Sequence, residues 1–268
     1  MKINPYYEFV KNFFLSYNCS ISDQGPYHMT IQLSADMDEE LMNRPFYWHY
    51  MKKMNRQGEP MQLTFTHTNG SEIEGIYLHA GSPMLQRIYG IAMKKGQSAR
   101  LYESIKEPVD QKAMNPWLIL NALIQYRGKQ ARDEQLSVGI NLIHGTILTN
   151  MMDSLWNISF DSQVSDYTFP MTPVISLISG YKRIHNYLDT YIQAADDSWA
   201  KDSILQLEKE QHLLQRFFET EDVSKDDFLK EQAQIETRYQ PRVTISIVNG
   251  GLFYISQQTS QGLLMKTT

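Results

Sequence analysis

The sequence predicts an α+β protein, in which an antiparallel β-sheet packs against helices and a long helical hairpin is inserted before the last strands. Two observations lead to this class. Apolar residues recur every three or four positions after Thr172, as on one face of a helix, and every second position over 242–255, as on one face of a strand. A continuous apolar run over 117–126 is also followed by alternation over 136–142, which predicts a strand hairpin.

Residues 1–58 are expected to form an N-terminal section of helices and a short strand. Asn4-Pro5 supplies a capping side chain followed by proline at the first helical position, and an aromatic stripe then continues to Tyr17. The other elements expected here are a strand over 28–33 and a helix whose acidic start at 36–40 suits the helix dipole, interrupted or restarted at Pro45.

Residues 59–172 are expected to form the main sheet region. Alternation over 63–67 and 73–78, with Asn69-Gly70 between, predicts a second hairpin. The remaining expectations are a helix over 82–96, a strand over 99–103 and a connector over 106–115, while residues 146–170 fit no element.

Residues 173–240 are expected to form the helical hairpin. One arm should run over 172–218, the turn should lie near 223–225, and the other arm should return over 226–239.

Residues 241–268 should close the sheet. Pro241 marks the helix end, residues 242–248 should lie beside the 117–126 strand or its hairpin partner, and Asn249-Gly250-Gly251 should turn a final hairpin before a frayed tail from 257. The residues expected to be largely buried are Phe9, Phe13, Leu33, Leu85, Ile88, Leu118, Leu120, Val138, Ile140, Ile245 and Ile247.

Composition narrows the classes of protein. The net charge of −5 argues against a generic nucleic-acid-binding module, although a local basic patch stays open. Cys19 is the single cysteine, which excludes an internal disulfide framework and a cysteine-rich zinc site. No signal-peptide core and no apolar run of about 20 residues is present, so a soluble cytoplasmic protein without a membrane span is expected.

No motif in the sequence names a reaction. The glycine patterns of phosphate loops, the serine elbow of hydrolases and the paired histidines of metal sites are all missing. We therefore expect no catalytic residues, no metal and no cofactor, and a non-enzymatic role is favoured.

Arg44, Tyr47, Trp48 and His49 form the densest functional candidate. Such aromatics could stack on a base or ring while the two basic side chains supply charge. The alternative is a core and subdomain junction, which is favoured because acidic chains seldom carry isolated base platforms.

Two charged groups are candidate contact sites. The expected tip of the 117–142 strand hairpin carries Arg127, Lys129 and Arg132. These residues are either part of a solvated turn or a contact for phosphate or an acidic partner. Lys209, Glu210 and Glu219 lie on the far part of the helical arm, which should project into solvent and could contact a partner.

Two segments resemble the YqhG family of Bacillus-type proteins, a family without an assigned function. They are residues 39–50 (EELMNRPFYWHY) and 239–255 (YQPRVTISIVNGGLFYI). The resemblance covers essentially the whole chain, and it brings no catalytic residues with it.

A second resemblance is to the region after the motor in RapA-like Swi/Snf-type ATPases. It depends on the order of four parts: residues 78–87 (LHAGSPMLQR), the strand pair 117–142, the charged helical hairpin and residues 242–247 (RVTISI). In those ATPases a small sheet carries an inserted helical hairpin. Because the YqhG family is associated with a neighbouring gene for such an ATPase, the resemblance implies a separately encoded, helicase-associated accessory protein.

The leading hypothesis is therefore a non-enzymatic accessory or interaction protein with a protein partner, either such an ATPase or the transcription machinery. The rival is an enzyme or small-ligand-binding protein that uses residues 44–50. A deep pocket lined by Arg44, Trp48 and His49 would favour the rival, and a shallow surface with an exposed apolar patch would favour the partner.

Overall fold

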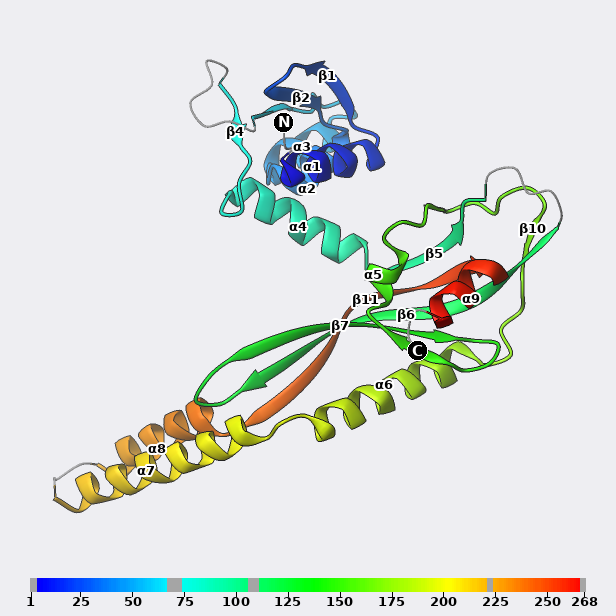
Figure 1. The fold of residues 1–268 in the computed structure, drawn as a ribbon. Coiled ribbons are helices and arrows are strands. Elements are labelled where there is room, and N and C mark those ends of the chain that lie inside the picture. Colours follow the sequence, from blue (N-terminus) through cyan, green and yellow to red (C-terminus); the bar gives the residue numbers. More distant parts are fainter. Residues whose placement is uncertain (1–3, 67–73, 106–110, 221–223, 266–268) are drawn as a thin grey trace. The chain divides into compact units, whose positions relative to one another are not determined.

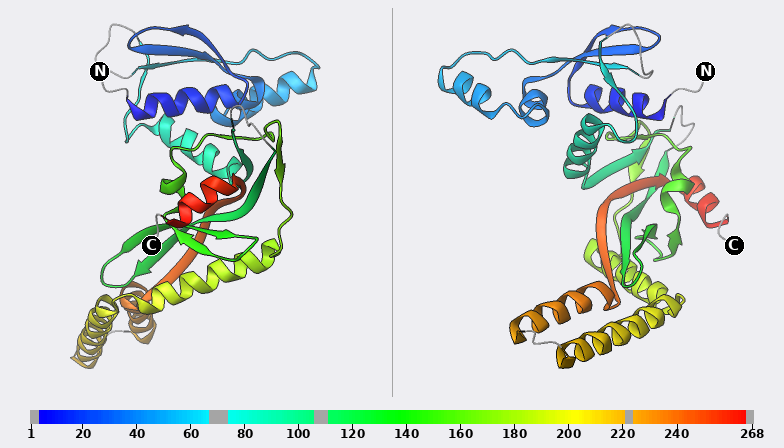
Figure 2. Two further views of the ribbon diagram at one scale, coloured as in Figure 1. Left: turned by 45° about the vertical axis from the view of Figure 1, so that its right-hand side comes forward. Right: turned by 90° about the vertical axis from the view of Figure 1, so that its left-hand side faces the viewer.

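The computed structural model describes residues 4–66, 74–105, 111–220 and 224–265 (Figures 1 and 2). Its contacts divide the chain into two compact units, unit 1 (residues 1–96) and unit 2 (residues 97–268). Helices and two mixed sheets make up the fold, so the predicted α+β class is confirmed. The division expected near residue 58 falls inside unit 1.

Unit 1 combines helices with a sheet of strand order β1-β2-β3-β4. Its helices are α1 (Pro5–Ser16), α2 (Ala35–Leu41), α3 (Pro45–Lys53) and α4 (Pro83–Lys95), and its strands are β1 (Ser20–Gln24), β2 (His28–Gln32), β3 (Gln62–Thr66) and β4 (Ile76–Tyr77). The predicted start at Asn4-Pro5, the restart at Pro45 and the helix from Pro83 to Gly96 are confirmed. The aromatic stripe of α1 packs with β2, β3 and α4 in one core, in which Val10, Phe14 and Phe65 are fully buried.

The prediction of a hairpin around Asn69-Gly70 is wrong in the direction of strand pairing. β3 and β4 pair in parallel, with Phe65 opposite Ile76, whereas a hairpin needs antiparallel strands. The two turn residues lie outside the described part of the chain. Alternation identifies which residues form strands, but it carries no information on the direction in which they pair.

Unit 2 is built on one mixed sheet of order β8-β7-β6-β11-β5-β9, and β10 also pairs with β6. Its strands are β5 (Ser98–Glu103), β6 (Lys112–Arg127), β7 (Arg132–Asn141), β8 (Ile147–Thr149), β9 (Phe160–Asp161), β10 (Thr168–Pro170) and β11 (Arg242–Ser256). Its helices are α5 (Met151–Leu155), α6 (Leu177–Ala194), α7 (Ser198–Thr220), α8 (Lys225–Tyr239) and α9 (Gln257–Met265). β8, α5, β9 and β10 lie within residues 146–170, which the sequence left unassigned. β6 begins at Lys112, inside the connector expected over 106–115.

The central ladder is β7-β6-β11, and it is antiparallel throughout. The predicted β6–β7 hairpin and the pairing of residues 242–247 with β6 are therefore confirmed. Both faces of β6 are covered near Trp117, by α6 on one side and by α5 and α9 on the other. Residues 257–265 are not frayed as expected, because they form α9. This helix buries Leu263, and its Ser260 hydroxyl accepts a 3.1 Å hydrogen bond from the Trp117 indole.

The final hairpin expected at Asn249-Gly250-Gly251 is also wrong. β11 runs straight through these residues with only a bulge between Ile247 and Asn249. A Cβ on Gly250 would lie 2.5 Å from Leu120 Cδ2, and one on Gly251 would lie 2.6 Å from the Ala99 carbonyl oxygen. The glycines therefore allow neighbouring strands to pack closely here, and they do not form a turn.

The single arm expected over 172–218 is two helices. α6 begins only at Leu177, capped by the Ser176 hydroxyl, and ends before an extended Ala195. Asp196 then accepts a 3.1 Å hydrogen bond from the Ser198 amide at the start of α7. The hairpin is therefore α7 with α8, which begins at Lys225, while residue 223 of the turn expected near 223–225 lies outside the described residues (Figure 1).

Most of the predicted core is confirmed. Phe13, Leu33, Leu85, Ile88, Leu120, Val138 and Ile140 are buried, Phe9, Leu118 and Ile245 are partly buried, and Ile247 is 37% exposed. In the parts of the chain that the structure describes, no helix is long and apolar enough to cross a membrane.

Candidate functional site

The aromatic segment 44–50 is organised by a buried carboxylate that the sequence did not single out. Asp38 on α2 is fully buried. Its oxygens accept hydrogen bonds from Arg44 Nη2 at 2.5 Å, Trp48 Nε1 at 2.8 Å and the Met61 amide at 2.6 Å. One acid thus joins α2, α3 and the segment that leads into β3.

These donors keep Asp38 ionised. Burial alone would raise the pKa of the carboxyl, but hydrogen bonds from Arg44, the Met61 amide and Trp48, together with the Arg44 charge, lower the pKa below its ordinary value. Arg44, Trp48 and the Met61 amide thus tie α3 and the segment before β3 to α2 through this carboxylate, an arrangement that we call the Asp38 lock.

Three of the four candidate residues in this segment pack within unit 1: Arg44 and Trp48 bind Asp38, and Tyr47 lies beside Arg44. Trp48 is 4% exposed, and the Arg44 guanidinium also lies 4.6 Å from the centroid of the Tyr47 ring. The Tyr47 hydroxyl accepts a 2.7 Å hydrogen bond from the Glu59 amide. Because these rings pack on their own chain, the junction interpretation describes them better than a base-stacking platform does.

The remaining candidate, His49, lies on the opposite, exposed face of α3. Phe46 is 90% exposed and Tyr50 is 54% exposed on the same helix. α3 thus presents two uncovered aromatic rings, although its other face is locked.

Two of the three cations at the β6–β7 turn, Arg127 and Arg132, are engaged within unit 2. Arg127 donates to Asp133 at 2.5 Å and to the Tyr126 carbonyl at 3.0 Å. The Arg132 guanidinium lies 4.2 Å from the centroid of the Tyr126 ring. Lys129 is exposed, and its backbone amide donates to Ser203 Oγ at 2.7 Å.

Ser203 is a residue that sequence reasoning missed. It lies on α7, is fully buried, accepts from the Lys129 amide and donates to the Tyr239 carbonyl at 2.5 Å. The Trp199 ring packs edge-on against Tyr126, 5.5 Å between centroids. The base of the α7–α8 pair is therefore fixed to the β6–β7 turn, and a lone serine inside a helix gives no sequence signal of this role.

The remaining candidates lie farther along the α7–α8 pair. Lys209 and Glu219 are exposed, and Glu210 is partly buried. Glu210 and Glu219 accept hydrogen bonds from glutamines one turn earlier on α7, at 2.9 and 3.3 Å. Around them large apolar side chains are also uncovered: Leu205 at 54%, Leu213 at 57%, Phe217 at 54% and Leu229 at 52% exposure.

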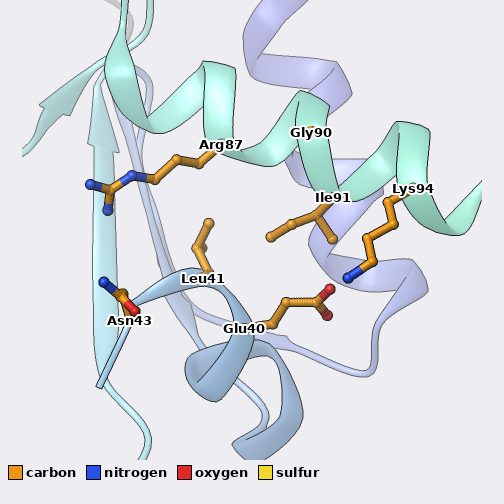
Figure 3. Close-up of a pocket in the computed structure, with 7 residues that line it drawn as sticks. All are labelled: Glu40, Leu41, Asn43, Arg87, Gly90, Ile91 and Lys94. Carbon is orange, nitrogen blue, oxygen red and sulfur yellow. The ribbon is translucent and has the colours of Figure 1, made fainter. Parts of the chain in front are cut away.

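A groove between α2 and α4 in unit 1 is a further candidate, with a cavity of about 410 Å³ (Figure 3). Arg87 and Lys94 project from α4 on either side of Gly90, and Glu40 and Asn43 lie opposite (Figure 3). Glu40 is paired with Lys95 at 2.8 Å, whereas Arg87 and Lys94 form no ion pair with any described residue. The groove therefore carries excess positive charge.

No group of three or more His, Cys, Asp or Glu side chains within the described ranges could hold a metal ion. The described surfaces present exposed aromatic and aliphatic side chains on α3, α7 and α8, and two cations beside a groove.

The fold and these surfaces define a two-unit α+β protein whose clustered charges are mostly engaged in its own framework. The chain belongs to the YqhG family, since the family model described as bacterial protein YqhG of unknown function matches residues 1–255. It is 33% identical over 263 residues to the uncharacterized protein YqhG of Bacillus subtilis (strain 168), covering 97% of this chain and 100% of that protein. The predicted family is thereby confirmed.

Proposed function

We propose that this chain is a non-enzymatic interaction protein whose α7–α8 pair contacts a protein partner, a Swi/Snf-type ATPase or a component of the transcription machinery. One observation carries the proposal. The pair is anchored at its base by Ser203, yet α8 has no buried residue and both helices leave large apolar side chains uncovered. Exposed apolar groups on an anchored element are typical of a protein contact.

The pair is also well enough ordered to present such a surface. Its helices touch along their length, through Ser203 with Tyr239 at the base, Gln211 with Glu236 at 3.5 Å, and Phe218 packed at a tilt of 46° against Phe228 with ring centroids 4.7 Å apart. A partner would therefore meet a preformed surface, which lowers the entropy cost of binding.

The identity of the partner is supported by the likeness to RapA-like ATPases. In those proteins a small sheet carries an inserted helical hairpin, and here α7 and α8 precede β11, which returns to the sheet beside β6. A separately encoded copy of this arrangement would suit an accessory protein of the motor.

Affinity purification of the tagged chain from its native cells, followed by mass spectrometry, tests the proposal. We compare wild type with Leu213→Lys/Phe217→Lys and with a charge reversal at Lys209, Glu210 and Glu219. Phe46→Lys, at a more exposed aromatic on α3, is the control. We expect the same ATPase or transcription protein to be recovered with wild type and control and to be lost with the α7 variants at unchanged melting temperature. Equal recovery by all variants would contradict the α7–α8 contact.

The groove between α2 and α4 supports a second candidate function, binding of a small anion. Arg87 and Lys94 lie seven positions apart, about 10.5 Å along the helix. A Cβ at Gly90 would meet nothing within 4 Å, so the helix surface between the two cations is open. A phosphorylated or dicarboxylate ligand could contact both cations while lying on Gly90.

Thermal shift and calorimetry with inorganic phosphate, pyrophosphate and ATP test this candidate. Binding should disappear in Arg87→Gln/Lys94→Gln and persist in Lys52→Gln, a lysine outside the groove that is paired with Glu39. Absence of a wild-type signal with all three anions removes the candidate.

A further inference from the structure

β11 has two halves with different neighbours. Residues 250–254 pair with β6 on one side and with β5 on the other. Residues 242–247 pair with β6 alone, and no strand in the described part of unit 2 lies on their other side. Over residues 242–248, about 23 Å of strand, the outward N–H and C=O groups are therefore open.

This open edge lacks the usual protection against pairing. Edge strands are commonly shielded by lysine, proline, bulges or covering elements. Residues 243–248 are Val-Thr-Ile-Ser-Ile-Val, with neither a charge nor a proline. Arg242 and the bulge after Ile247 limit the edge only at its ends.

The two faces of the edge are chemically different. Val243, Ile245 and Ile247 lie opposite Tyr126, Ile124 and Ala122 of β6, on the face that packs with α6. Val243 and Ile247 are each 37% exposed. Thr244 and Ser246 point to the other face. An added strand would match this edge if its own residues alternated between apolar and polar.

A hollow continues the apolar face beyond the edge. It has a volume of about 680 Å³ and is lined by Leu118, Ile247, Gly250 and Leu177 of α6, next to the start of β5. Leu177, at the start of α6, is 47% exposed. An apolar side chain of an added strand would enter this hollow and be covered by α6.

We propose that residues 242–248 are a docking edge for an extended, uncharged segment of a partner protein, which adds to the sheet as a strand beside β11. The proposal deepens the proposed function, on which it rests, by naming a surface for the partner next to α8. Such strand addition combines main-chain hydrogen bonds with pockets for alternate side chains.

The ends of the edge favour a partner segment over a second copy. α8 ends at Tyr239, just before the edge, and β5 begins at Ser98, opposite Gly250. A second copy pairing through the same edge would bring its own α8 and β5 against these ends. A free extended segment carries neither element.

The test uses a phage-displayed library of random peptides of about ten residues, long enough to cover the edge, selected on the full purified chain. The edge variant is Val243→Lys/Ile247→Lys, in which half-exposed positions can carry the charge into solvent. The matched control, Phe46→Lys/Tyr50→Lys, alters two exposed aromatic residues of α3 in unit 1. Melting temperature and light scattering accompany each protein.

We expect enriched peptides to alternate between apolar and polar residues, to bind the edge variant about tenfold more weakly, and to bind the control as wild type. Outward amides of 243–247 should gain protection from hydrogen exchange when peptide is bound. Enriched peptides that bind the edge variant equally well, or no enriched peptides, would overturn the docking edge. A wild-type dimer that the edge variant abolishes would overturn the choice of occupant.

A second pair of variants covers the case in which lysines disturb folding. Along a strand, successive residues direct their N–H groups to opposite sides. One of Thr244→Pro and Ile245→Pro therefore removes an outward donor, and the other removes a donor paired with β6. The better-folded variant should lose peptide binding, and retained binding contradicts the edge. Failure of the purification from cells alongside a positive peptide result would reject the named partner and leave the edge intact.

Discussion

Unit 1 and unit 2 each contain an Arg–Asp ion pair. The two pairs have the same length but differ in how far the aspartate is buried, so they show what burial adds to an ion pair. Arg44–Asp38 and Arg127–Asp133 have the same shortest N–O distance of 2.5 Å. The Asp38 side chain is 0% exposed, whereas that of Asp133 is 50% exposed. Asp38 also holds Trp48 and the Met61 amide, but Asp133 is a surface acid of the β6–β7 turn.

The difference shows that the distance between the two charged groups does not by itself determine how much an ion pair contributes to the free energy of unfolding. Water screens the exposed pair, so it contributes little to folding. The buried carboxylate has lost its water, and its three donors would be left without an acceptor if the acid were removed. Both arginines were candidate contact residues, and in the structure each is engaged by an acid of its own unit.

Removing the buried acid should have the largest effect. We expect Asp38→Ala to destabilise unit 1 by about 3–5 kcal/mol, because Arg44 and the Trp48 and Met61 N–H groups lose their acceptor. Urea unfolding followed by hydrogen exchange of β2 amides measures this loss. Asp133→Ala is the control in unit 2. Equal shifts for the two variants would remove the distinction drawn from burial.

The same acid should make unit 1 sensitive to low pH. The pKa of Asp38 in the folded chain lies below the unfolded value of about 3.9. Its contribution to stability is therefore fully present above that pH and is lost as the pH falls through the folded-state pKa. We expect the unfolding midpoint of unit 1 to fall on acidification, and to fall less steeply in Asp38→Asn. Parallel pH curves for the two proteins would assign the acid sensitivity to other groups.

In unit 2, a neutral hydroxyl should matter more than the Arg–Asp pair of the same turn. Ser203 is fully buried and bonds to the Lys129 amide and the Tyr239 carbonyl. We expect Ser203→Ala to cost about 1–3 kcal/mol, since two partly buried backbone groups lose their partner. Hydrogen exchange should accelerate in α7 and α8 and stay unchanged in β6. Asp202→Ala, at the exposed neighbouring position inside the same helix, is the control, and an equal change there would deny Ser203 its anchoring role.

The sequence was informative where one period continues without interruption. The stripe of α1, the alternation of β7 and the return of β11 to β6 follow from such a period, and the continuous apolar run of β6 fits a strand that is covered on both faces. The glycine pair at 250–251 misled, since close strand packing and a tight turn both require a missing side chain. The helix break at Ala195 was hidden because the apolar spacing continues across it.

The candidate site was less predictable than the fold. Asp38 was interpreted as one of several acids at a helix start, and only the folded chain brings Arg44, Trp48 and Met61 onto it. Ser203 and the groove at Arg87 and Lys94 likewise depend on residues distant in the sequence. Local patterns report which face of an element is apolar, but they do not report which polar groups meet.

The smallest effect on stability should come from the exposed pair, and it also tests the β6–β7 turn as a contact. In Asp133→Ala, Arg127 keeps its bond to the Tyr126 carbonyl, so the unfolding midpoint of unit 2 should stay within experimental scatter at low and high salt.

The same pair can be tested as a binding site. The Arg127 hydrogen bond lowers the pKa of Asp133, so the acid is ionised at neutral pH and forms an ion pair with the Arg127 guanidinium. If an acidic partner or phosphate uses Arg127, it must displace Asp133. Asp133→Ala should then bind that partner more tightly, while Arg127→Gln binds it more weakly, as measured by calorimetry with the partner purified from cells. Identical affinities for wild type and both variants would leave the Arg127–Asp133 pair as a feature of the turn alone.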